Sequence, residues 1–162
     1  SAPASRPTLA TSREPSRIEP GPAGSSPFSF PLLVQPVLDR HCLRCHDGQE
    51  GPGKSKLALT REPTKQFSRS YLNLQPYLRW YEWGGASISQ IATHPGHIGA
   101  DESPLTRILD DPTHGAHVGL PDTDRRVLYL WLDANVPFYG TYGREEQLAQ
   151  RAGQSVSPPR FQ

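Results

Sequence analysis

The chain contains only two cysteines, and they lie three residues apart in the segment HCLRCH, residues 41–46. A histidine directly follows the second cysteine, which completes the pattern Cys42-x-x-Cys45-His46. Two thiols at this spacing can form thioethers with the two vinyl groups of one porphyrin, and the adjacent histidine can then reach the iron. The segment therefore predicts one covalently bound haem c, with Cys42 and Cys45 as attachment points and His46 as the proximal iron ligand.

Two other interpretations of the cysteine pair find less support in the sequence. A redox-active dithiol is typical of a βαβ context, and no alternating apolar pattern predicts a strand here. A structural zinc ion needs four ligands, and without a second cysteine pair two of them would be histidines such as His94 and His97. His41 directly precedes Cys42, so it could reach the same iron only with strain, and we expect it on the helix surface or beside a haem propionate.

The second axial ligand of the iron cannot be a methionine, because the chain contains none. Histidines occur in two later glycine-rich segments, the first with His94 and His97 and the second with His114 and His117. Glycine lets such a segment approach a porphyrin closely. His117 is our first choice, because the apolar run after it can anchor it beside the helix that follows. His114 is the second choice, and His94, His97 or an open position remain alternatives.

Composition and helix signals predict a mainly α fold. With 18 prolines, 14 glycines and only 35% hydrophobic residues, the chain needs another source of apolar core surface, which a porphyrin can supply. Ser103 and Pro104 suit the start of a helix in 103–111. Residues 122–136 have the apolar spacing of a longer helix, whose buried stripe would be Val127, Leu128, Trp131 and Ala134. We predict a cytochrome c-like helical domain with long Gly/Pro-rich loops around one haem.

The sequence divides into three parts by amino-acid composition and apolar pattern. Residues 1–26 are rich in Pro, Ser, Ala and Arg and predict an extended or disordered lead-in. Residues 27–143 form the predicted monohaem domain, in which 112–121 is expected to be a loop. Residues 144–162 form a polar C-terminal tail.

Charge and hydropathy exclude some kinds of partner. The formal net charge is +1 with both signs interspersed, which gives no electrostatic basis for binding nucleic acid. No apolar run approaches the length of a membrane span. Because covalent haem attachment takes place outside the cytoplasm, we expect the protein in the periplasm or an equivalent compartment.

Four separated blocks of the sequence resemble parts of one known haem-carrying module: residues 17–50, 67–71, 99–109 and 117–142. The module is the C-terminal cytochrome c module of hydrazine synthase alpha-subunit-like proteins, which are multihaem proteins of planctomycetes and their relatives. The last block includes the run WLDANVPFYG. The resemblance covers nearly everything from about residue 17 to residue 143.

The resemblance implies a bis-histidine haem that exchanges electrons with other haem domains or redox proteins. It matches Cys42 and Cys45 to the thioether cysteines, His46 to the proximal ligand, and the distal ligand to His117 or His114. The catalytic haem of such proteins lies in an earlier module, so hydrazine chemistry is not implied for this chain. We therefore expect an electron-transfer domain rather than an enzyme. A haem enzyme or small-ligand-binding module with an open distal site, and a structural haem module, remain alternatives.

Overall fold

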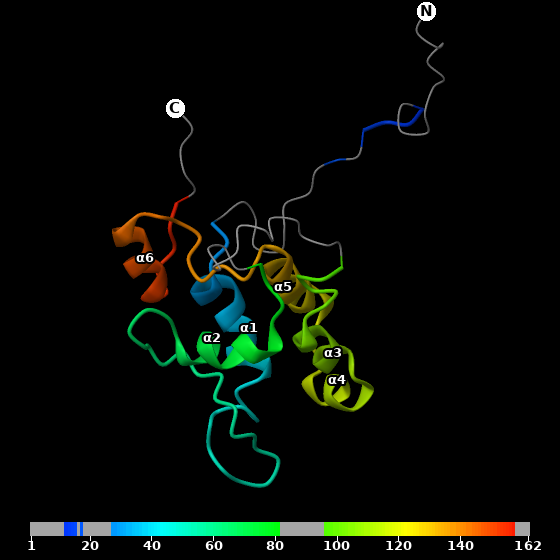
Figure 1. The fold of residues 1–162 in the computed structure, drawn as a ribbon, viewed down its shortest axis with the longest axis vertical. Helices are drawn as coiled ribbons and strands as arrows, with labels where there is room; N and C mark the ends of the chain where they lie inside the picture. The colour runs from blue at the N-terminus through cyan, green and yellow to red at the C-terminus, as the bar shows by residue number, and fades with distance from the viewer. Residues whose placement is uncertain (1–11, 16, 18–26, 82–95, 158–162) are drawn as a thin grey trace, which may run out of the picture.

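The computed structural model of the chain describes residues 12–15, 17, 27–81 and 96–157 (Figure 1). Within these residues, helices are joined by long loops and only isolated β-bridges occur, so the prediction of a mainly α fold is confirmed. None of the described helices is long and apolar enough to cross a membrane. The elements are the π-helical turn η1 (Phe30–Val34), α1 (Gln35–His41), α2 (Arg69–Leu74), the 3-10 turn η2 (Gln75–Tyr77), α3 (Pro104–Asp110), α4 (Pro112–Val118), α5 (Asp122–Asp133) and α6 (Arg144–Arg151).

Helix α1 delivers the cysteine motif. It continues directly from η1, and Pro36 lies in its first turn, where the missing N–H of proline costs no helical hydrogen bond. The helix ends at His41, and the N–H of Cys42 still donates to the carbonyl oxygen of Leu38 at 2.8 Å. The Cys-x-x-Cys-His segment therefore starts from a fixed helix end.

Aromatic side chains from three parts of the chain form the centre of the core. Phe30 and Trp131 are fully buried, with ring centroids 5.2 Å apart. Tyr71 lies 5.2 Å from Phe30 and 4.9 Å from Phe138, both in edge-to-face geometry. Such pairs contribute about 0.5–1.5 kcal/mol each beyond their buried area. The cluster holds η1 against α5 and so fixes the direction in which α1 runs.

Helix α3 starts where the sequence predicted, with Ser103 before it and Pro104 in its first turn. The Ser103 hydroxyl does not cap the helix; it accepts a hydrogen bond from the N–H of Arg79 at 3.0 Å and so ties the helix start to the end of η2. Leu105 and Leu109 are buried. This helix forms one wall of the cavity described below.

Residues 112–121 were predicted to be a loop, and that prediction is wrong, because seven of them form α4. Asp111 caps the helix, Pro112 occupies its first turn, and Gly119 ends it in the left-handed conformation with φ 58°. Each of these is a standard helix boundary signal. Both histidines of the segment therefore lie on a helix.

Helix α5 carries the predicted apolar stripe with one change. Val127, Leu128 and Trp131 are buried as expected. Ala134 is exposed, because the helix ends at Asp133 and Ala134 is already its C-cap. The core contact at this end of the helix comes from Leu132 instead.

The polar segment 144–162 contains α6, which packs against η1. Gln150 is fully buried, and its side-chain oxygen accepts a hydrogen bond from the N–H of Gly140 at 3.1 Å. The packed part of the chain therefore continues past residue 143. The predicted lead-in, 1–26, lies mostly outside the described residues.

Candidate functional site

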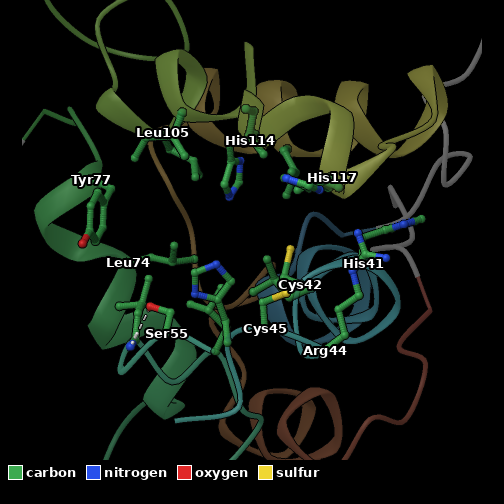
Figure 2. A pocket seen from close by; sticks show the side chains of 18 of the residues that line it. His41, Cys42, Arg44, Cys45, Ser55, Leu74, Tyr77, Leu105, His114 and His117 are labelled. Atoms are coloured by element: carbon green, nitrogen blue, oxygen red, sulfur yellow. Dashed lines mark hydrogen bonds between the residues drawn. The ribbon is translucent and has the colours of Figure 1, made fainter. Parts of the chain in front are cut away.

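A cavity of about 770 Å³ lies between the cysteine motif and helices α3 and α4. Its volume falls in the range of about 300–1,000 Å³ that is typical of ligand and cofactor pockets. Cys42, Cys45 and His46 line it, as do His114 and His117. Figure 2 shows both α4 histidines on one side of the pocket and the two cysteines on the opposite side. The structure therefore brings together all five residues that we placed first in the site.

Most of the remaining wall is apolar. Leu57 and Leu59 both line the cavity, and their spacing of two residues is that of one face of an extended chain. No site role was predicted for these residues, although a short apolar run directly after a glycine-rich loop was a usable signal. The other aliphatic residues of the wall are Leu38, Leu74, Leu105, Ile108, Leu109, Ala116, Val118 and Leu128.

Backbone hydrogen bonds hold the motif in one turn. The N–H groups of Cys45 and His46 both donate to the carbonyl oxygen of Cys42, at 3.1 and 2.9 Å. The following loop is tied to this turn, because Ser55 N–H donates to Cys45 O and Leu59 N–H donates to His46 O, both at 2.7 Å. The two sulfurs and the imidazole of His46 are thereby presented to the cavity from one anchored turn.

The environment of Cys42 differs from that of the nucleophilic cysteine in a redox-active dithiol. Both cysteines are free. Burial raises the pKa of the Cys42 thiol to about 11 and the nearby Cys45 adds to the rise, although the positive charge of Arg44 acts in the opposite direction. Redox dithiols need a nucleophilic cysteine with a lowered pKa. The environment of Cys42 has the opposite effect.

The imidazole rings of His46 and His114 lie across the cavity from each other, with centroids 6.3 Å apart and planes inclined at 60°. An imidazole nitrogen binds a first-row metal at about 2.0–2.1 Å. A five-membered ring with bonds of about 1.33 Å places that nitrogen about 1.1 Å from the ring centre. Two imidazoles on opposite sides of one metal ion therefore have centroids about 6.3 Å apart. The observed separation equals this value.

Both of these rings carry a buried nitrogen without a partner. Neither Nδ1 atom has a hydrogen bond, which is rare for buried polar atoms. Burial lowers the pKa of His46, and the nearby His114 lowers it further. The Leu57 backbone has a smaller effect that raises this pKa, but it makes no hydrogen bond with Nδ1. A neutral imidazole offers a lone pair to a metal. The environment of His46 therefore favours the form that binds a metal.

The other candidate histidines are placed less favourably. His117, our first choice as the distal ligand, lines the cavity but is exposed, one turn beyond His114. His97 does not line this cavity. His94 lies outside the described residues. The ring opposite His46 is thus that of our second choice, His114.

His41 points to a different partner. Its Nε2 lies 2.7 Å from Oδ2 of Asp124, and Arg40 donates to Oδ1 of the same carboxylate at 3.0 Å. Although burial raises the pKa of Asp124, the hydrogen bonds from His41 and Arg40 outweigh it and hold that pKa below its usual range. This cluster joins the end of α1 to the first turn of α5.

The number of potential ligands at the site limits which metals it could bind. Among the described residues, no three or more His, Cys, Asp or Glu side chains are grouped to hold a metal ion. A structural zinc ion needs four protein ligands. Two imidazoles suffice only for a metal that arrives with its other ligands, as haem iron does. The two free thiols beside them, the leucine-rich walls and the volume of the cavity fit the same group.

Comparison of the chain with protein-family models, curated proteins and solved structures found no match.

Proposed function

We propose that this chain is a c-type cytochrome domain, with one haem c attached through Cys42 and Cys45 and its iron bound by His46 and His114. We place His114 in the distal position instead of His117. The observation that carries the proposal is the spacing of 6.3 Å between the two imidazole centroids. It is the spacing that a single shared metal ion requires, and it occurs beside the two free thiols.

Electron transfer is the function that this arrangement supports best. When bound, a haem supplies a one-electron Fe(III)/Fe(II) couple. If His46 and His114 both held the iron, no position on it would be open for a substrate, and leucine side chains would surround much of the haem. The absence of methionine removes the ligand that raises the potential of many c-type haems. The haem iron would therefore be low-spin, and its reduction potential would be low.

The partners would be other haem domains or redox proteins in the periplasm or an equivalent compartment. The resemblance to the C-terminal module of hydrazine synthase alpha-subunit-like proteins supports this role, because that module also resembles a bis-histidine electron-transfer centre. The balanced charge of the chain gives no reason to expect nucleic acid as a partner.

The proposal can be tested on the chain produced in a host that attaches haem c. We expect a mass increase of one haem and a low-spin ferric spectrum. His114→Ala and His117→Ala form a matched pair, because both remove a histidine from α4 three residues apart. The first should convert the iron to high spin and let the ferrous protein bind carbon monoxide; the second should leave the low-spin spectrum unchanged.

Three results would contradict parts of this proposal. A chain that acquires no covalent haem would refute it altogether. Rapid carbon monoxide binding by the unmodified ferrous protein would mean an open distal site, as in a haem enzyme or a small-ligand-binding module. Loss of the low-spin spectrum in His117→Ala but not in His114→Ala would make His117 the distal ligand.

A further inference from the structure

We infer that Gly115 and Asp111 are positioning residues that select His114, and not His117, as the distal ligand of the iron. The inference rests on the proposed haem site. It concerns how α4 is held, because α4 itself contributes no buried residue to the core. Only the half-buried Val118 of α4 packs against the core, so the position of the helix depends mainly on its contact with α3 and on its caps.

Gly115 lies where α4 passes closest to the last turn of α3. A Cβ atom at this position would lie 2.9 Å from the carbonyl oxygen of Leu109. That oxygen belongs to the backbone of a helix whose side chains Leu105 and Leu109 are buried in the core, so it cannot move aside easily. The absence of a side chain at Gly115 lets α4 approach α3 more closely than any other residue would allow.

Asp111 fixes the start of the same helix. Its Oδ1 accepts hydrogen bonds from the N–H groups of Thr113 at 3.0 Å and His114 at 2.8 Å. Its backbone carbonyl accepts from the N–H of Gly115 at 2.7 Å. The backbone of His114 is thus held directly by the cap on one side and by the Gly115 contact on the other.

The placement of α4 decides between the two histidines. Side chains advance by about 100° per residue around a helix, so His114 and His117 point about 60° apart. Only one of them can point at a given spot in the cavity for a given rotation and depth of the helix. Because Gly115 directly follows His114, widening the contact with α3 would move the His114 ring relative to His46.

The test compares carbon monoxide binding to the ferrous, haem-loaded full chain and its Gly115→Ala variant. Alanine forms helices better than glycine. If the contact with α3 did not matter, Gly115→Ala would therefore stabilise α4 and slow carbon monoxide binding. We expect the opposite result, about tenfold faster binding and a partial high-spin ferric signal, as overpacking strain predicts. Thr113→Ala is the control: it gives a similar gain in helix propensity at an exposed position outside the cavity wall and should keep the original rate.

The Asp111 variants give an independent measurement if Gly115→Ala does not accumulate. Asp111→Ala removes the acceptor for two helix N–H groups and should speed carbon monoxide binding, whereas Asp111→Asn retains a capping oxygen and should restore the original rate. Equal rates for the two Asp111 variants, or an unchanged or slower rate for Gly115→Ala, would overturn the inference.

The outcomes also separate this inference from the proposed function. If the unmodified ferrous protein already binds carbon monoxide as an open haem does, the bis-histidine site fails. If the unmodified protein is closed and His114→Ala opens it, but Gly115→Ala stays closed, the haem site stands and only the positioning role is refuted.

Discussion

Replacing Gln35 with alanine should strongly destabilise the protein, because this side chain joins three parts of the fold that support the cysteine motif. Gln35 is 1% exposed. Its Nε2 donates to Oδ1 of Asp39 at 2.8 Å and to the carbonyl oxygen of Leu59 at 3.1 Å, and its Oε1 accepts from the hydroxyl of Ser70. The N–H of Leu59 in turn donates to the carbonyl of His46. Gln35 therefore stabilises the loop that is hydrogen-bonded to His46.

The expected loss in the free energy of unfolding depends on which hydrogen bonds each partner of Gln35 retains in the variant. Asp39 and Ser70 each retain another hydrogen bond, to an arginine and to a second serine, so each lost bond costs about 0.5–1.5 kcal/mol. The buried carbonyl of Leu59 has no other hydrogen-bond donor among the described residues, and leaving it unpaired costs about 1–3 kcal/mol. The total is about 2–6 kcal/mol, and at roughly 3 °C per kcal/mol the melting temperature should fall by roughly 6–18 °C.

Thermal and urea unfolding of the haem-loaded protein, followed by circular dichroism, would measure this loss. Gln147→Ala is the matched control, because Gln147 is only half-buried and makes one hydrogen bond, to the carbonyl oxygen of Thr141 at 2.9 Å. Its loss should be no more than about 1.5 kcal/mol. If both variants lose the same stability, the buried network around Gln35 does not support the fold as argued.

Two further predictions concern stability. Because the pKa of Asp124 is held below 3.8 in the folded state, its ion pair with the permanently charged Arg40 is fully present above that pH and is lost as the pH falls through the folded pKa. Asp124→Asn should therefore be less stable than the unmodified protein at pH 7 and lose less stability on acidification to pH 3; parallel urea profiles would contradict this. Tyr71→Phe removes a 2.9 Å hydrogen bond to the carbonyl of Val136 and should cost about 0.5–1.5 kcal/mol, whereas Tyr142→Phe, at a fully exposed ring, should cost nothing measurable in the same urea titration.

Several features of the fold followed from local sequence alone. The start of α3 depends on a proline in the first turn, Pro104, whose fixed φ suits a helix start in any context. The buried stripe of α5 follows from apolar spacing. These predictions succeeded because they depend on residues within one or two turns of each other.

Helix α4 was not predicted, because its stability depends on contacts outside its own sequence. Its boundary residues, Asp111, Pro112 and Gly119, were readable in the sequence. A seven-residue helix with an internal glycine is nevertheless unstable alone, so a loop was the natural expectation. The close contact with α3 that Gly115 permits stabilises the helix, and that contact depends on the packing of both helices. The burial of Gln150 in the segment predicted as a tail has a similar origin.

The sequence by itself determined the class of cofactor that we propose, because the spacing of Cys42, Cys45 and His46 is a property of one helical turn. It also excluded methionine as a ligand by composition. Only the tertiary structure shows that His114 lies opposite His46, since that placement depends on the rotation and depth of α4 above a turn some 70 residues earlier in the chain. Local patterns specify which residues can bind a metal; the packing of one helix on another decides which of them meet.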